Sequence, residues 1–152
     1  MRIRPVKVGA WVLAAWGLAA VLVSCGKGPG AAAPAPVTCF CFLNTHPCES
    51  SRRLEDWTRG ALREAFPADL QSGRLVIQTL NYEKPGQEHY LKDYDLPFQS
   101  IVLQEGPPKS RWLRLDGLWR YLGDQAGFRK MVQDEAAKYL AGDCRQNPKD
   151  SK

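Results

Sequence analysis

Histidine is scarce in this sequence, and neither charge is in strong excess. Two His and five Cys are present among 152 residues, and their spacing matches no common zinc site. Lys and Arg number 21 against 16 Asp and Glu, but three of the basic residues lie at positions 2, 4 and 7. Without those three, 18 basic residues face 16 acidic ones, so the charge indicates no surface for a nucleic acid. Flavin and nicotinamide signatures are also missing. We therefore expect no metal, no organic cofactor and no nucleic-acid partner.

The first 24 residues follow the order of a bacterial signal peptide. Arg2, Arg4 and Lys7 precede an uncharged run over residues 8–23, which leads into Leu-Val-Ser-Cys at residues 22–25. A basic start, a short apolar run and a small residue before the cleavage point are typical of a removed targeting segment. The last four residues resemble the bacterial lipobox, which implies a diacylated Cys25 and cleavage just before it. The alternative is an uncleaved membrane helix, because the apolar run approaches the ~20 residues that cross a bilayer.

A lipidated Cys25 predicts an extracytoplasmic protein anchored to the bacterial cell envelope. Two or three acyl chains anchor a protein durably, whereas one chain binds only marginally. The Gly that follows Cys25 resembles the outer-membrane sorting pattern of hosts with two membranes. Residues 26–36 contain only Gly, Ala, Pro and one Lys; such a tether spans about 35 Å when extended. We therefore expect a signal peptide at 1–24, a lipidated Cys and tether at 25–36, a folded domain at 37–143 and a polar tail at 144–152.

The folded part alternates short apolar runs with amphipathic segments. Strands are predicted at 37–43, 75–80, 100–104 and 111–115, helices at 47–66, 85–94 and 125–141, and a helical turn at 118–122. Pro47 suits the first position of the first helix, and Pro67 ends that helix. A helix joins the first two strands, so we expect them to be parallel, and the last two to form an antiparallel hairpin. The resulting order, β-α-β-α-β-β-α with a mixed four-stranded sheet, is an α/β arrangement and the order of the thioredoxin-like fold.

The turn from the first strand into the first helix is where thioredoxin-like proteins carry Cys-x-x-Cys. Here residues 48–51 read Cys-Glu-Ser-Ser, so the first Cys is present and Ser51 stands at the second position. At the N-terminus of a helix, amide groups and the helix dipole favour the thiolate. Cys48 is therefore the candidate reactive thiol.

A longer stretch, residues 42–62, resembles the thioredoxin-like family described as nitrophenyl compound nitroreductase subunit ArsF. Its members combine an aromatic strand, a Thr two or three residues before the first Cys, Cys-x-x-Cys, and a Glu four residues after the second Cys. Thr45, Cys48 and Glu55 occupy those positions, and the likeness extends over about residues 37–141. Because the sequence has no flavin or nicotinamide signature, we do not expect the nitroreductase activity that the family's description implies.

Two departures limit the chemistry expected of Cys48. Ser51 replaces the second Cys, and Ser100 stands where most thioredoxins have a cis-proline. Without a resolving thiol, Cys48 can attack a disulfide of a protein partner but cannot complete an internal disulfide. Ser51 can donate a hydrogen bond to the thiolate, and a protonated His46 can lower the pKa of the thiol. Glu55, on the same helix face as Cys48, resembles the buried acid of thioredoxins, although such a residue is more often a solvated carboxylate.

The remaining Cys residues have other expected roles. Cys39 and Cys41 share one face of a strand, where a buried Cys behaves as a small hydrophobe. Cys144 can form a disulfide with another Cys in an oxidising compartment, and the sequence does not choose the pair. A metal site made of Cys39, Cys41, Cys48 and His46 is supported by ligand type but not by spacing.

Two functions stay open from the sequence. The first is thiol–disulfide handling by a monothiol, thioredoxin-like lipoprotein that uses Cys48. The second is a redox-inactive thioredoxin-like module that binds a partner protein at the membrane surface, which the missing second Cys and the missing cis-proline favour. Both place a lipid-anchored domain in contact with a protein partner.

Overall fold

Four strands form one mixed sheet in the computed structural model, which describes residues 35–143. Cys25 and Cys144 lie outside the described residues, as do the predicted signal peptide, most of the tether and the tail. The strands are β1 (Val37–Leu43), β2 (Leu75–Asn81), β3 (Ser100–Glu105) and β4 (Trp112–Arg114). Their order is β2-β1-β3-β4; β1 and β2 are parallel, whereas β3 is antiparallel to both β1 and β4. The mixed four-stranded sheet, its parallel pair and its hairpin are thereby confirmed.

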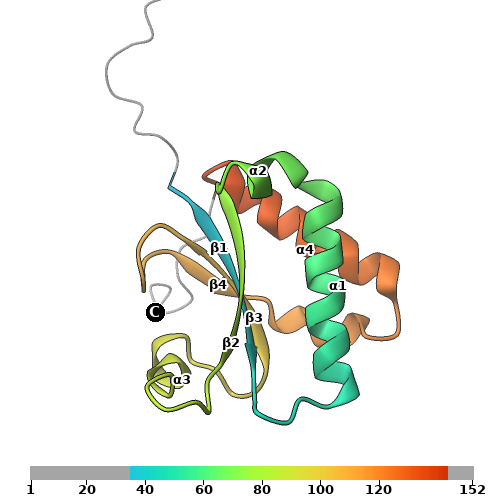
Figure 1. The fold of residues 1–152 in the computed structure, drawn as a ribbon. Helices are drawn as coiled ribbons and strands as arrows, with labels where there is room; N and C mark the ends of the chain where they lie inside the picture. The colour runs from blue at the N-terminus through green and yellow to red at the C-terminus, as the bar shows by residue number, and fades with distance from the viewer. Residues whose placement is uncertain (1–34, 144–152) are drawn as a thin grey trace, which may run out of the picture. The chain divides into compact units, whose positions relative to one another are not determined.

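Helices cover both faces of the sheet. The helical elements are α1 (Glu49–Ala65), α2 (Pro67–Gln71), α3 (His89–Asp93), the 3₁₀ helix η1 (Asp116–Tyr121) and α4 (Gln125–Leu140). The two long helices, α1 and α4, pack against each other on one face, and the short α3 lies on the other (Figure 1). Between residues 35 and 143 no helix has the length and apolar character needed to cross a membrane.

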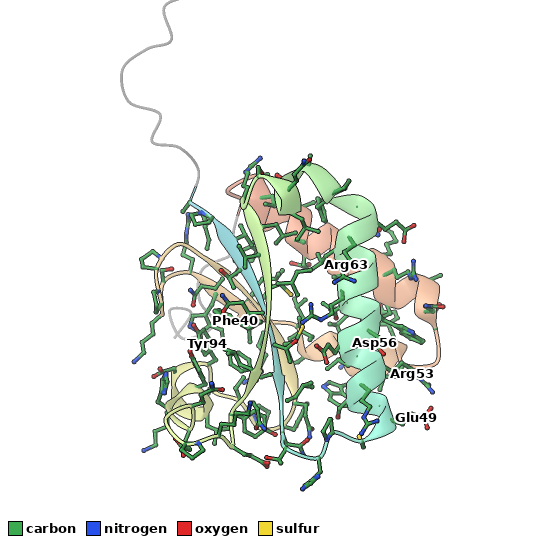
Figure 2. All side chains as sticks on the ribbon, in the orientation of Figure 1. Phe40, Glu49, Arg53, Asp56, Arg63 and Tyr94 are labelled. Carbon is green, nitrogen blue, oxygen red and sulfur yellow. The ribbon has the colours of Figure 1, made fainter. Side chains whose placement is uncertain are left out.

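The alternation of side chains along β1 produces two apolar cores. Cys39 and Cys41 face the long helices and belong to the larger core, which includes Leu54 of α1. Phe40 and Phe42 face the other way and pack against Tyr94; Figure 2 shows Phe40 and Tyr94 on the side of the sheet away from α1. Because β1 is covered on both faces, its sequence reads as a continuous apolar run rather than an alternating one.

Several element boundaries differ from those predicted, and three of the differences involve a proline or a glycine. Helix α1 begins at Glu49 with Cys48 as its N-cap, so Pro47 precedes the helix rather than occupying its first position. Pro67 ends α1 as expected but also starts α2, because proline is compatible with the first helical turn. Helix α3 begins only at His89, since Gly86 has a φ of 85°, which no right-handed helix accommodates.

Candidate functional site

Cys48 lies exposed at the N-terminal end of α1, just after the turn that leaves β1. Its backbone is extended, with φ −69° and ψ 170°, and its carbonyl accepts a hydrogen bond from the N–H of Arg52. The thiol is free, and Sγ lies 3.2 Å from Oγ of Ser51. The Ser51 side chain is fully buried, so the thiol faces solvent on one side and a buried hydroxyl on the other. The structure thus brings together two of the four predicted site residues.

The hydroxyl of Ser51 holds the pKa of the Cys48 thiol below its ordinary value, because it hydrogen-bonds the thiolate. The backbone N–H groups of Ser51 and Ser50 act in the same direction, and slight desolvation opposes them. Amides in the first turn of a helix lack intrahelical partners and favour a negative charge nearby. A lowered pKa increases the thiolate fraction near neutral pH, and the thiolate is the nucleophilic form.

The loop that leads into Cys48 is tied to the end of β2. Asn81 Nδ2 donates to Thr45 Oγ1 at 3.2 Å, and the backbone N–H of Thr45 donates to Glu83 Oε2 at 2.7 Å. The same contact with Thr45 lowers the pKa of the Glu83 carboxyl, with a smaller contribution from the charge of His46. His46 is exposed and is not among the groups that shift the pKa of Cys48. The charge of His46 therefore lowers the pKa of the Glu83 carboxyl and not, as predicted, that of the Cys48 thiol.

Glu55 lies two turns along α1 from Cys48 and is held by other partners. Its Oε1 is 3.0 Å from Nε of Arg59 and accepts a hydrogen bond from the Thr79 hydroxyl of β2. The Arg59 guanidinium also donates to Thr79. The Glu55 carboxylate does not contribute to the pKa shift of Cys48, so the structure does not place it as an acid beneath the thiol.

An ion pair neutralises the acidic residue next to Cys48. Arg53 Nη2 is 2.6 Å from Glu49 Oε1 in the first turn of α1, where Figure 2 labels both residues. Arg53 Nη1 also donates to the carbonyl of Leu122, at 3.4 Å, in the loop after η1. Arg53 was missed as a site residue, although its spacing of four from Glu49 is the signal of a helical ion pair. It connects the thiol-bearing end of α1 to the segment that follows β4.

Ser100, predicted to stand at the cis-proline position, is the first residue of β3. It pairs with Phe42 near the end of β1, and its hydroxyl donates to the Phe98 carbonyl at 2.8 Å. Every peptide bond from residue 35 to residue 143 is trans. Ser100 is buried, so its hydroxyl fixes the turn before β3 at the same end of the sheet at which the chain leaves β1.

The other two described Cys residues are separated from Cys48 by the fold. Cys39 and Cys41 are fully buried and free. A hydrogen bond with Cys41, together with burial, raises the pKa of the Cys39 thiol. Among the described residues no group of three or more His, Cys, Asp or Glu side chains is placed to hold a metal ion. The metal site considered from ligand types is therefore not formed, because two of its thiols face the core and the third faces solvent.

No family model matches this sequence, and no curated protein matches it. The resemblance of residues 42–62 to the ArsF family accordingly stays a prediction. The chemistry of the site has to be inferred from its own residues, of which Cys48 and Ser51 are the pair in direct contact.

Proposed function

We propose that this chain is a lipid-anchored extracytoplasmic protein whose thioredoxin-like domain exchanges disulfides with a partner protein through Cys48 alone. The observation that carries the proposal is the exposed Cys48 Sγ at the N-terminal end of α1, 3.2 Å from the buried hydroxyl of Ser51. An exposed thiol with a lowered pKa is a typical reactive Cys, whereas structural buried Cys residues are inert.

Support for a thioredoxin-like domain comes from the order of the elements and the place of the thiol. A strand, a helix and a parallel strand are followed by a short helix, a hairpin and a final helix. Cys48 stands between β1 and α1, where thioredoxin-like proteins carry the first Cys of their motif. The added α2 and η1 lie in connections and leave this order unchanged.

The proposed reaction is thiol–disulfide exchange. The Cys48 thiolate attacks one sulfur of a partner disulfide, a mixed disulfide forms, and the second partner sulfur leaves as a thiolate that takes a proton from solvent. An external thiolate then attacks the partner sulfur of the mixed disulfide and releases Cys48 as a thiolate. Ser51 stabilises the thiolate at both ends of this cycle but, having no sulfur, cannot resolve the mixed disulfide. The mixed disulfide is therefore released either by an external thiol or by the partner's own second thiolate, which reverses the first step.

The thiol proposal is tested by the pH dependence of Cys48 alkylation with iodoacetamide. The rate should rise with pH around a midpoint below that of an unperturbed Cys, because the lowered pKa lets the thiolate form at lower pH. Ser51→Ala should move this midpoint upward. Ser50→Ala is the matched control and should leave it unchanged, because only the backbone of Ser50 acts on the thiol. Glu55→Gln should also leave it unchanged, since Glu55 pairs with Arg59.

A wild-type midpoint equal to that of an unperturbed Cys would remove the thiol proposal and favour the redox-inactive, partner-binding alternative. One observation supports that alternative. Phe98 is 44% exposed and its ring lies edge-on to Trp119, with centroids 5.3 Å apart. The two rings line an open depression of about 260 Å³. Phe98 precedes β3 and Trp119 follows β4, so both lie at the sheet end where Cys48 precedes α1, and they offer an apolar contact for a protein.

The lipid anchor is tested by the intact mass of the protein isolated from bacterial membranes. We expect a chain that starts at Cys25 and carries two or three acyl chains on it, because residues 22–25 resemble a lipobox. Cys25→Ala should leave the precursor unprocessed and without lipid. Wild-type protein that keeps Met1 and has no acyl mass would contradict the anchor and support an uncleaved membrane helix.

A further inference from the structure

Strand β2 is an edge strand without the usual protection of edges. It lies at one end of the sheet and pairs along its length with β1; no other strand of the described chain, residues 35–143, covers its outer side. Its seven residues, LVIQTLN, include neither proline nor a charged residue. The opposite edge, β4, has three residues and carries Arg114. Natural proteins protect edges by short strands, charge or proline, so β4 is protected and β2 offers its backbone groups for pairing.

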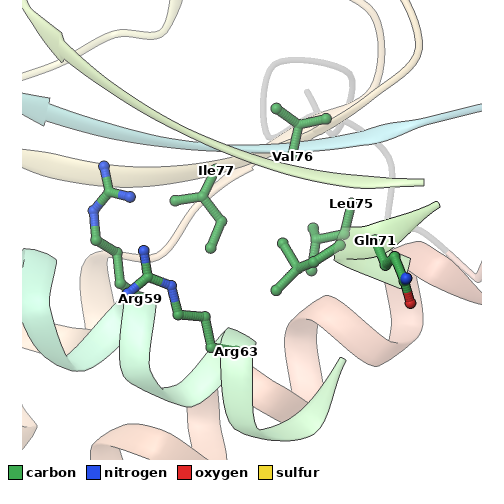
Figure 3. A pocket seen from close by; sticks show the side chains of 7 residues that line it. Arg59, Arg63, Gln71, Leu75, Val76 and Ile77 are labelled. Atoms are coloured by element: carbon green, nitrogen blue, oxygen red, sulfur yellow. The ribbon is translucent and has the colours of Figure 1, made fainter. Parts of the chain in front are cut away.

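A groove of about 520 Å³ lies between β2 and α1, beside this free edge. Leu75 and Ile77 of β2 and Leu70 of α2 form its apolar part. Arg59 and Arg63 of α1 extend over it, and Figure 3 shows both guanidinium groups directed toward β2. The groove thus combines an apolar floor with two cationic groups next to an unpaired strand edge.

The two arginines differ in their partners. Arg59 is engaged by the Glu55 carboxylate and the Thr79 hydroxyl. Arg63 is exposed and has no hydrogen-bond or ion-pair partner among residues 35–143. Because Glu55 balances Arg59, the groove keeps one net positive charge, on the guanidinium of Arg63. A guanidinium binds a carboxylate through two parallel hydrogen bonds.

We propose that the edge of β2 and this groove bind an extended acidic segment of a partner protein, which adds to the sheet as a further strand. Backbone hydrogen bonds to β2 hold the segment, and every second side chain faces the groove. A carboxylate of the segment pairs with Arg63, and an apolar side chain two residues away packs against Leu70 and Ile77, which are partly exposed in the groove. A second copy of the chain is the poorer occupant, because pairing β2 with β2 would bring two positively charged grooves together.

The test measures binding of a labelled peptide to the full-length protein by fluorescence anisotropy. The peptide is as long as β2; on one face its residues alternate glutamate and valine, and threonine fills the positions between them. Its counterpart has lysine in place of each glutamate. The glutamate peptide should bind and the lysine peptide should not. Arg63→Glu should weaken binding by about tenfold or more. Arg52→Glu is the matched control, since Arg52 is exposed on the same helix outside the groove, and it should change the affinity by less than about twofold.

Strand pairing has its own readout. Methylating every second backbone nitrogen of the glutamate peptide should abolish binding in one register and spare it in the other, because alternate N–H groups face β2. Cys48→Ser should bind the peptide like the wild type, so this inference and the thiol proposal can fail separately. The inference is overturned if the glutamate peptide does not bind at millimolar concentration, or if both arginine variants weaken it equally. It is also overturned if both methylated peptides bind, or if only phosphatidylglycerol vesicles show the dependence on Arg63.

Discussion

Replacing Ser51 with Cys is expected to convert the single thiol into a reversible dithiol. Sγ of Cys48 and Oγ of Ser51 are already 3.2 Å apart, and a disulfide needs a separation of about 2.05 Å, so a small side-chain adjustment closes the bond. Ser51→Cys also creates Cys-x-x-Cys, with the second thiol in the buried position of Ser51. After mild oxidation the variant should lose two hydrogen atoms, and peptide mapping should locate the new disulfide at residues 48 and 51.

The same variant should reduce disulfides faster than the wild type. With dithiothreitol as reductant, Ser51→Cys should reduce insulin disulfides repeatedly, because the second thiol resolves the mixed disulfide. The wild type should turn over more slowly, because its mixed disulfide is resolved only when dithiothreitol attacks it. Ser50→Cys adds a thiol one residue away and serves as the control, which should neither close a disulfide with Cys48 nor exceed the rate of the wild type. Free thiols at both position 48 and position 51 of oxidised Ser51→Cys would show that the Cys48–Ser51 geometry is not as described.

The order of the elements could be predicted because each signal is local. Residues 37–43 are apolar except for Thr38, as a strand covered on both faces requires, and this strand forms as expected. Residues 67–71 were not expected to be helical, because Pro67 was interpreted only as the end of α1. A proline at the first position of a new helix gives the same sequence signal as a stop, so the sequence alone does not distinguish the two.

In the candidate site, the sequence predicts only the contact between residues that are close together in the chain. Cys48 and Ser51 are three residues apart at a helix start, and this spacing places their side chains together. The contacts that hold the preceding loop join Thr45 to Asn81 and Glu83, 36 and 38 residues away. No local sequence pattern predicts contacts between residues so far apart in the chain. The position of Glu55 on α1 predicts a role beneath the thiol, but its partner Thr79 lies on β2, 24 residues away, and no local pattern indicates that contact.

In the folded protein, Cys39 and Cys41 are expected to be alkylated on the order of a thousandfold more slowly than Cys48. Both are fully buried in the core between the sheet and α1, so iodoacetamide reaches them only when the domain opens. Burial and the hydrogen bond with Cys41 also raise the pKa of Cys39, which keeps that thiol protonated and unreactive. Mass spectrometry with peptide mapping, followed over time, should show Cys48 modified first and the buried pair much later.

A substitution in the core tests whether burial, rather than the chemistry of the thiols, keeps Cys39 and Cys41 from reacting. Leu54→Ala removes a buried side chain from the core that holds Cys39 and Cys41 and should lower the free energy of unfolding by about 2–5 kcal/mol. If opening and closing are fast relative to alkylation, both buried thiols should then react more than about tenfold faster, while the exposed Cys48 keeps its rate. Leu91→Ala, at a leucine that is 37% exposed, is the matched control and should leave all three rates unchanged. Buried thiols that react as fast as Cys48 in the wild type would contradict their burial, and Cys48 would then no longer be distinguished by its place in the fold.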